Sequence, residues 1–423
     1  MKVLVVTDVL WRNDNGVGNS YSNIFANIPD VTVANICCQT GASDNCVSTA
    51  CFQISESGLL KSLLHPHVDP GMREDPEQPK TETKEASAFV WIKRSRLQIF
   101  LWMRELIWQL GRWKSDGLKA FIDDFQPDIV FTQLQDKRYL SRLARFVADY
   151  ANVPLVAYVW DDVYSLRQFS LSPLFWIDRL LQRRSIRKLA KRISVLYTIC
   201  QEQKEEYERT LNVRTELLYK GYPFANCPEQ APVGTPVRLL YTGNLYSGRY
   251  KTLLRLCKTL AKNADQLPAL TLDIYSATPL TSKEIAALNI KNISAFHGKI
   301  SESQVQKLQK QADVLLHIEP FSLKGSLLCR LSFSTKLVDY FHHRKCIFAV
   351  GPLRCASMQY LRKNQAAVVA CSLEEAEQKL PELLKNPEDI SRYGQNAWNC
   401  GEKNHRITAI QKHLLTSMKE QIS

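Results

Sequence analysis

The order of apolar runs along the chain is the feature that most constrains its fold. Short runs rich in Val, Ile and Leu alternate with segments of helical periodicity, as is typical of βαβ units and parallel sheets. The runs are continuous rather than alternating, which favours strands covered on both faces. The first half contains Lys2–Thr7, Val31–Ile36, Ile129–Thr132, Leu155–Val159 and Val195–Ile199. The second half contains Arg238–Thr242, Leu270–Tyr275, Ile293–Phe296, Val314–Ile318 and Cys346–Val350. The pattern predicts an α/β protein with two parallel sheets.

A proline-rich break separates the two sets of strands. The chain has 423 residues, and single hydrophobic cores rarely grow past about 250–300 residues. We therefore predict two Rossmann-like domains, 1–224 and 237–400, joined by a linker at 225–236. Residues 401–423 are expected to form a C-terminal helix that packs back on the first domain. Residues 65–84 hold four prolines and lack periodicity, which predicts a mobile loop.

Composition narrows the class of protein. Twelve cysteines occur without a Cys-x-x-Cys pair or a Cys/His group at zinc spacing, which favours reduced thiols over disulfides or metal ligands. No uninterrupted apolar run reaches the roughly 18 residues that a membrane span needs. The chain begins directly with a predicted strand and lacks the pattern of a signal peptide. We therefore expect a cytoplasmic protein without a bound metal.

Positive charge is concentrated in two segments of the first half. The chain has 55 Lys and Arg against 42 Asp and Glu, a net charge of +13. Residues 91–115 contain six basic residues and one acidic residue, and residues 179–192 contain seven basic residues and no acidic one. No nucleic-acid-binding motif accompanies this charge, so we expect no nucleic acid partner.

Both basic segments are predicted to form amphipathic helices that also carry aromatic residues. In 172–192, Ser172 is a plausible N-cap, and the helix places Leu174 and Ile177 on one side and Arg183 and Arg187 on the other. Cations beside Trp and Phe are typical of helices that lie in a membrane interface. We expect 91–115 and 172–192 to contact an anionic membrane; ordinary amphipathic helices with solvated basic faces are the alternative.

In open α/β sheets, ligands bind where the strands end, so the loops after the strands hold candidate site residues. Gly16 and Gly18 follow the first strand and precede a helix start, where they could let the backbone approach an anion; a plain turn is the alternative. Asp161 and Asp162 follow the fourth strand and are candidates for a general base or for holding an acceptor hydroxyl. Helix capping is the alternative for one of them. Lys220 could reach a phosphate or lie on the surface.

The second half has a denser set of polar residues after its strands. Gly243 and Asn244, followed by Arg249, are typical of a diphosphate-binding arrangement. His297 follows another strand and is either a site residue or a structural histidine. Glu319 comes directly after the strand Val314–Ile318.

The strongest pattern begins at Ser334. Ser334 and Thr335 stand at a predicted helix N-terminus, which offers N–H groups and hydroxyls to a phosphate, and Lys336 adds a full charge. Asp339 lies one turn further along the same face and suits ribose hydroxyls.

These residues resemble those of GT-B fold glycosyltransferases of the family 4 type, particularly the bacterial enzymes that build capsule, exopolysaccharide or lipopolysaccharide. The resemblance covers nearly the whole length and implies two domains facing across a cleft. It implies that Arg249 and Lys336 neutralise the donor diphosphate, while Ser334 and Thr335 bind it through backbone amides and Asp339 holds the ribose. The remaining donor-site candidates are Gly16, Gly18, Lys220, Gly243, Asn244 and His297.

The chain departs from the family pattern at two points. Glu319 is expected to approach the donor sugar, but Leu327 stands where the family usually has a second glutamate, and Asp339 is the nearest counterpart. The histidine usual near the first-domain active site is absent, which leaves Asp161 or Asp162 in its place.

The resemblance implies a reaction and a location. The reaction is the metal-independent transfer of a sugar, with retention, from a UDP- or GDP-type nucleotide sugar to a hydroxyl of a lipid-linked saccharide. The location is the cytoplasmic face of the cell membrane, in surface polysaccharide synthesis. The alternatives are a nucleotide-sugar 2-epimerase of the same fold and a non-catalytic scaffold protein.

Overall fold

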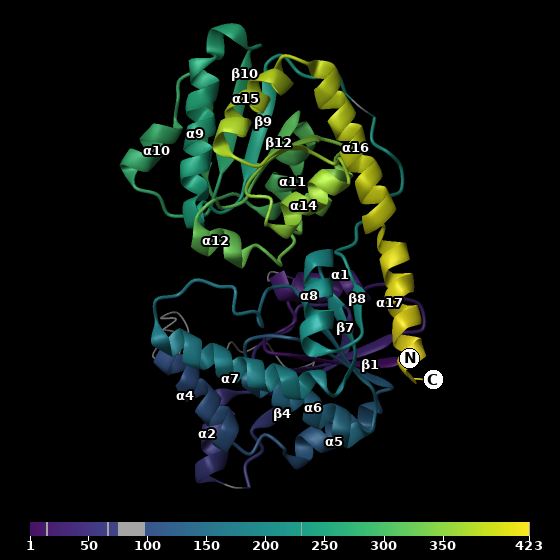
Figure 1. Cartoon of the computed structure of the whole chain (residues 1–423). Helices are drawn as coiled ribbons and strands as arrows, with labels where there is room; N and C mark the ends of the chain where they lie inside the picture. Colours follow the sequence, from purple (N-terminus) through teal and green to yellow (C-terminus); the bar gives the residue numbers. More distant parts are fainter. Residues whose placement is uncertain (14–15, 66, 75–97, 230, 423) are drawn as a thin grey trace. The chain divides into compact units, whose positions relative to one another are not determined.

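The computed structural model describes residues 1–13, 16–65, 67–74, 98–229 and 231–422 (Figure 1). The chain divides into two compact units. The first comprises Met1–Leu166, Ser170–Leu218 and Ile410–Ser423, and the second comprises Arg167–Phe169 and Tyr219–Ala409.

The first unit is built on an eight-stranded sheet in the order β4-β3-β2-β1-β5-β6-β7-β8. Neighbouring strands are parallel, except that β4 is antiparallel to β3. The strands are β1 (Lys2–Thr7), β2 (Thr32–Cys37), β3 (Ser48–Ile54), β4 (Gly71–Arg73), β5 (Ile129–Gln133), β6 (Leu155–Val159), β7 (Ile193–Thr198) and β8 (Thr215–Leu217). The helices are α1 (Gly16–Phe25), α2 (Glu56–Leu64), α4 (Gln98–Leu110), α5 (Asp116–Phe125), α6 (Arg138–Ala151), α7 (Pro173–Ala190) and α8 (Gln201–Leu211). All five strands predicted for this half are present within two residues of the predicted bounds.

The second unit is built on a six-stranded, wholly parallel sheet in the order β11-β10-β9-β12-β13-β14. The strands are β9 (Val237–Thr242), β10 (Leu270–Tyr275), β11 (Ser294–Gly298), β12 (Val314–Ile318), β13 (Cys346–Val350) and β14 (Val368–Ala370). The helices are α9 (Arg249–Lys262), α10 (Ser282–Leu288), α11 (Glu302–Gln311), α12 (Leu323–Leu328), α13 (Lys336–His342), α14 (Ala356–Lys363), α15 (Leu373–Leu384) and α16 (Pro387–His405). Strands β12 and β13 are buried along their whole length, which explains their continuous apolar runs.

The loop predicted for 65–84 is wrong at Gly71–Arg73, which form the edge strand β4. A side chain at Gly71 would meet the Phe52 ring at 2.3 Å, so glycine lets this short strand lie close to β3. Residues 75–84 of the predicted loop lie outside the described residues.

The boundary between the units lies after Leu218 rather than after residue 224. Backbone hydrogen bonds tie the following residues to the second unit, because the Tyr222 amide donates to the His405 carbonyl (2.8 Å) and the Ile407 amide donates to the Tyr222 carbonyl (2.9 Å). The segment predicted as a linker, 225–236, is therefore part of the second unit.

The C-terminal segment forms two helices rather than one. Helix α16 ends at His405, and α17 (Ile407–Ile422) follows, with residues from Ile410 onward in the first unit. There Tyr197 Oη donates to Ser417 Oγ (2.8 Å) and Gln411 Nε2 donates to the Ala26 carbonyl (2.8 Å). The end of the chain thus packs on the first unit.

The first half of helix α7 is turned the opposite way from the prediction. Its N-terminal apolar residues Leu174 and Ile177 are exposed, whereas Arg179 is buried. Arg183 lies over the Tyr164 ring at 4.1 Å, and Arg187 Nε donates to Tyr164 Oη (2.8 Å). Arg179 and Arg183 pack inward because the loop before the helix presents carbonyl oxygens that need donors.

Helix α4 also directs part of its predicted surface inward. Trp108 is fully buried and stacks on Tyr139, with ring centroids 4.7 Å apart. Arg104 forms an ion pair with the buried Glu56. The basic residues of 91–97 lie outside the described residues. No helix among those described is long and apolar enough to cross a membrane.

Candidate functional site

A cavity of about 200 Å³ lies at the carboxyl end of the second sheet. Strands β9 and β12, from which the strand order runs in opposite directions, end there, and such a switch point is where open α/β sheets bind ligands. The lining residues are Tyr241, Thr242, Asn244, Arg249, Leu316, His317, Ile318, Glu319, Cys329, Ser332, Phe333, Ser334, Lys336 and Tyr340. Of the predicted site residues, the cavity brings together Asn244, Arg249, Glu319, Ser334 and Lys336.

Arg249 begins helix α9 and spans the floor between the two strand ends. Its Nε donates to the Ile318 carbonyl (2.9 Å), and its Nη1 donates to Asn244 Oδ1 (3.2 Å). Its Nη2 lies 3.0 Å from Glu319 Oε2. Burial by itself would lower the pKa of Arg249, but the charge of Glu319 raises it. The guanidinium is therefore charged and held in one orientation.

Glu319 is buried and ionised. Burial would raise the pKa of this carboxyl group, but His317 and Arg249 lower it to about 2. His317 Nε2 lies 3.3 Å from Glu319 Oε1. A side chain at Gly351 would meet Glu319 Cβ at 2.6 Å, so glycine on the neighbouring strand end makes room for the carboxylate.

Lys336 is the first residue of α13 and reaches back to β9, where its Nζ donates to the Thr242 carbonyl (3.1 Å). A side chain at Gly243 would meet this Nζ at 2.7 Å. Gly243 does not line the cavity, but its missing side chain is what lets the lysine lie across the strand end. Burial and the charge of Arg249 lower the pKa of Lys336.

Ser334 and Thr335 differ from what the helix-start pattern predicted. Ser334 lines the cavity. Its amide, however, donates to Ser357 Oγ (3.0 Å) and so already has a partner within the protein. Thr335 precedes α13 without a side-chain capping bond and does not line the cavity.

Lys220 and Asp339 are brought together with each other rather than into the cavity. Lys220 Nζ lies 2.9 Å from Asp339 Oδ1, and neither residue lines the cavity. Burial raises the pKa of Asp339 although Lys220 opposes this. The pair joins the start of the second unit to α13.

His297 lies away from the cavity, at the end of the outer strand β11. Its Nε2 is 2.7 Å from Asp273 Oδ1, and its ring stacks on Tyr275 at 4.7 Å. These contacts match the structural alternative for this histidine.

The two glycines after β1 differ in how much space surrounds them. Gly16 begins α1, with open space where a side chain would point. A side chain at Gly18 would meet the Arg12 carbonyl oxygen at 2.0 Å, so Gly18 allows the loop to fold onto the helix.

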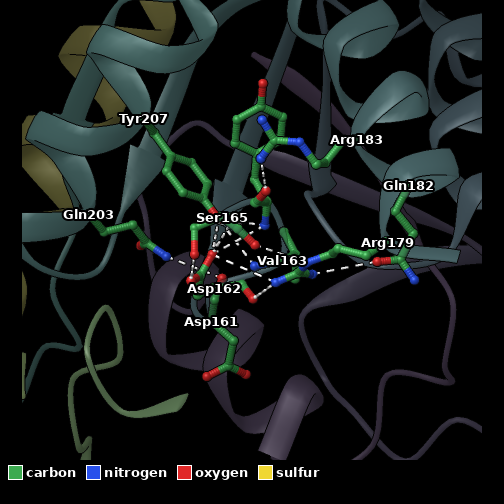
Figure 2. A network of polar contacts seen from close by, with 10 residues as sticks. Asp161, Asp162, Val163, Ser165, Arg179, Gln182, Arg183, Gln203 and Tyr207 are labelled. Carbon is green, nitrogen blue, oxygen red and sulfur yellow. Dashed lines mark hydrogen bonds and ion pairs between the residues drawn. The ribbon is translucent and has the colours of Figure 1, made fainter. Parts of the chain in front are cut away.

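Asp161 and Asp162 occupy different environments at the end of β6 (Figure 2). Asp162 is buried and accepts hydrogen bonds from the amides of Tyr164 (3.2 Å) and Ser165 (2.8 Å). Asp161 is exposed, and its carboxylate points away from the polar contacts around Asp162. No helix starts at Asp162, so the helix-capping alternative is wrong, and the buried carboxylate instead holds its own turn.

Sequence reasoning missed several polar residues at the carboxyl ends of the central strands in both sheets. His317 is a histidine inside an apolar strand, two positions before Glu319, and that position was the available signal. In the first unit, Asp8 after β1 forms an ion pair with Lys137 and accepts from Gln135 Nε2 (2.8 Å). Burial lowers the pKa of Lys137 to about 8. These residues lie at the switch point between β1 and β5, which only the strand order reveals.

Comparison with solved structures places the whole chain in one architecture. HepE from Anabaena, in complex with UDP, covers 99% of this chain and 100% of its own with a TM-score of 0.64 and 13% identity. The fold is GT-B. Sucrose-phosphate synthase from Thermosynechococcus elongatus matches over 99% of both chains, with a TM-score of 0.61 and 12% identity.

A third match is an α,α-trehalose-phosphate synthase (UDP-forming) from Burkholderia xenovorans in complex with glucose-6-phosphate. It covers 99% of this chain and 100% of its own, with a TM-score of 0.61 and 9% identity. No family model and no curated protein matches the sequence. The likeness is therefore one of fold: two Rossmann-like α/β domains, as the strand pattern predicted.

Proposed function

We propose that this protein is a glycosyltransferase whose second unit binds the diphosphate of a nucleotide sugar. The observation that carries the proposal is the convergence of Arg249 and Lys336 on one cavity at the switch point. Arg249 comes from the helix after β9, and Lys336 comes from the helix after β12 and α12. Two cations that converge at such a place suit a diphosphate.

The same arrangement suits the chemistry of the leaving group. Negative charge grows on the diphosphate as its bond to the sugar breaks, and preorganised cations stabilise that charge. Glu319 holds the Arg249 guanidinium in place, and the Thr242 carbonyl holds Lys336. We propose that these two cations supply the positive charge for the reaction and that no metal ion is needed.

UDP is the first nucleotide to test. HepE has been solved with UDP and with UDP-glucose, and the trehalose-phosphate synthase is described as UDP-forming. GDP stays the second candidate. Retention at the anomeric carbon stays a prediction from the resemblance to family 4 enzymes, as does the role of Glu319 beside the donor sugar. Ribose binding by Asp339 would require the Lys220 pair to open or to share the carboxylate.

We propose further that the acceptor is a lipid-linked saccharide and that the first unit contacts the membrane from the cytoplasmic side. Support comes from α7, whose Leu174, Ile177 and Leu180 are each about half exposed, and from Leu171 before it, which is 88% exposed. Exposed cations continue the helix, namely Arg184, Lys188 and Lys191. Apolar side chains followed by cations match a bilayer with anionic headgroups.

Helix α4 extends the proposed membrane surface. Leu101, Met103, Leu106 and Leu110 are exposed on it, and its Trp102 Nε1 donates to Asp178 of α7 (3.1 Å). The two helices are therefore neighbours. This surface differs from the predicted one at the start of α7. There Leu174 and Ile177 face outward, whereas Arg179 is buried. Surface polysaccharide synthesis is the pathway class that such an acceptor would serve.

Titration calorimetry with UDP and GDP tests the donor site directly. We expect one of them to bind, and we expect Arg249→Ala to abolish the heat signal. Arg255→Ala is the matched control, since Arg255 lies on the same helix but pairs with Glu374 and Glu377. Absence of binding by either nucleotide would favour the scaffold alternative.

Product analysis separates transfer from epimerisation. The protein is incubated with the nucleotide sugar that stabilises it most and with a lipid-linked saccharide. Glycosylated acceptor is identified by mass, and the nucleotide sugar and its 2-epimer, which have the same mass, are separated by chromatography. A glycosylated acceptor supports the proposal. Conversion of the nucleotide sugar into its 2-epimer without any glycosylated acceptor would support the epimerase alternative.

A further inference from the structure

The loop after β6 is held by an arginine of α7, the helix that follows it. Arg179 of α7 is 5% exposed. Its Nη2 donates to the Asp162 carbonyl (2.8 Å), and its Nε donates to the Ser165 carbonyl (3.1 Å). The same Nη2 lies 3.9 Å from Asp162 Oδ1. One guanidinium thus joins both ends of the turn (Figure 2).

The Asp162 carboxylate is committed to the interior of this turn. Besides the amides of Tyr164 and Ser165, the hydroxyl of Ser165 donates to it. Tyr207 Oη lies 3.4 Å from Asp162 Oδ1. A buried carboxylate that accepts several bonds and neighbours an arginine stabilises the loop that contains it. Any substrate contact would cost these bonds.

Helix α8 fixes the other side of the loop. Tyr207 Oη accepts hydrogen bonds from the amides of Val163 (3.1 Å) and Tyr164 (3.2 Å). Gln203 Nε2 donates to the Asp161 carbonyl (3.2 Å), while its Oε1 accepts from the Ile199 amide (3.2 Å). The backbone of Asp161 is therefore tied to the end of β7.

Asp161 presents its carboxylate on the outside of this rigid turn. The residue is exposed, and Figure 2 shows its carboxylate directed away from Arg179, Asp162 and Tyr207. It follows β6 at the carboxyl end of the first sheet, where ligands of open α/β sheets bind. A carboxylate in such a place is suited to accept a hydrogen bond from a sugar hydroxyl.

We propose that Asp161 orients the acceptor hydroxyl and that Arg179 is a positioning residue that acts through the turn 162–165. The inference rests on the proposed function, since it assigns the acceptor contact of the same transfer reaction. Asp161 contacts the acceptor, whereas Asp162 and Arg179 do not. Exact placement matters because a shift of about 1 Å can cost roughly 100-fold in rate.

The experiment compares Asp161→Asn, Asp162→Asn and Arg179→Gln in the full chain. The measurements are kcat/KM for the acceptor, the rate of donor hydrolysis without acceptor, UDP affinity and the midpoint of thermal unfolding. We expect Asp161→Asn to lower acceptor kcat/KM by about ten- to a hundredfold, the loss typical of a hydrogen bond to a charged group. UDP affinity, donor hydrolysis and the unfolding midpoint should stay unchanged.

The other two variants should behave differently from Asp161→Asn. Asp162→Asn keeps one oxygen for the two amides, so we expect a lower unfolding midpoint and acceptor kcat/KM within about tenfold of wild type. Arg179→Gln should lower acceptor kcat/KM, again without changing UDP affinity or donor hydrolysis, and Arg179→Lys should restore part of the loss.

A double variant tests whether Arg179 acts through Asp161. If it does, Asp161→Asn combined with Arg179→Gln should be no worse than the poorer single variant, because coupled residues are not additive. Multiplied losses would overturn the positioning role. A large loss in Asp162→Asn with full activity in Asp161→Asn would overturn the assignment to Asp161. Failure of wild type to bind UDP or GDP would instead refute the proposed function.

Discussion

At the scale of single residues, the donor cavity depends on side chains that hold one another. Arg249 and Glu319 are placed by their ion pair, and Lys336 is placed by the Thr242 carbonyl and by the absence of a side chain at Gly243. Each of these charged groups has a polar partner in the cavity wall. The two cations are therefore in position before any anion arrives.

Removing either cation should lower the rate of sugar transfer much more than it lowers the stability of the fold. We expect Lys336→Ala and Arg249→Ala each to slow sugar transfer by about 100-fold or more, since each group stabilises charge that develops on the leaving diphosphate. Initial rates at saturating donor and acceptor check this. Lys324→Ala, at a lysine that does not line the cavity, should retain the wild-type rate.

Glu319 should make the stability of the second unit depend on pH. Its pKa is about 2 in the folded protein, against an ordinary value of 4.5. Its contribution to stability is therefore present above pH 4.5 and is lost as the pH falls toward 2. The full contribution is about 3 kcal/mol, of which about 2 kcal/mol should be lost between pH 6 and pH 3.

Urea unfolding at pH 6 and pH 3 measures this loss. Between pH 6 and pH 3, the free energy of unfolding of the Glu319→Gln variant should fall by about 2 kcal/mol less than that of wild type. Glu382→Gln, at an exposed glutamate of α15, should show the wild-type dependence. An equal pH dependence in wild type and Glu319→Gln would mean that the carboxylate is not held as the structure shows.

At the scale of elements, α7 has two faces with separate tasks. Its arginines hold the turn after β6, and its N-terminal apolar residues face outward. The outward apolar side chains of α7 are about half exposed, so nothing in the first unit covers them completely. The same element can therefore serve the acceptor loop and a surface.

Charged substitutions on the outer face of α7 should weaken membrane binding without unfolding the protein. We expect Leu174→Glu and Ile177→Glu each to reduce partitioning into vesicles that contain anionic lipid by about tenfold, because each substitution removes apolar contact and adds a repelled charge. Vesicle sedimentation measures this. Leu323→Glu, at an exposed leucine of the second unit, should bind vesicles like wild type.

At the scale of the whole molecule, the two units carry separate parts of the proposed reaction. The cavity with the paired cations belongs entirely to the second unit, and the turn of Asp161 belongs to the first. Binding of the nucleotide should therefore stabilise the molecule unevenly.

Hydrogen exchange with and without UDP tests this unevenness. We expect added protection at the ends of β9 and β12 and at the start of α13, where the cavity lies. At a UDP concentration 100 times the dissociation constant, the second unit should gain about 2.7 kcal/mol of stability. Protection confined to the first unit would contradict the placement of the donor site.

The sequence by itself determined the α/β class, the two sets of parallel strands and the arginine, lysine and glutamate side chains of the cavity. Val314–Ile318 and Cys346–Val350 could be predicted to the residue, because continuous apolar runs report burial on both faces. Asn244, Arg249, Glu319 and Lys336 could be found because strand ends are local features of the chain.

Only the tertiary structure decided which of these polar residues act together. It paired Lys220 with Asp339, turned Arg179 of α7 inward and placed the Asp162 carboxylate inside its own loop. The physical reason is that a buried charge takes the partner that lies within a few ångströms, and that partner can come from any part of the chain. Local periodicity reports which residues are buried, but it does not report what they meet there.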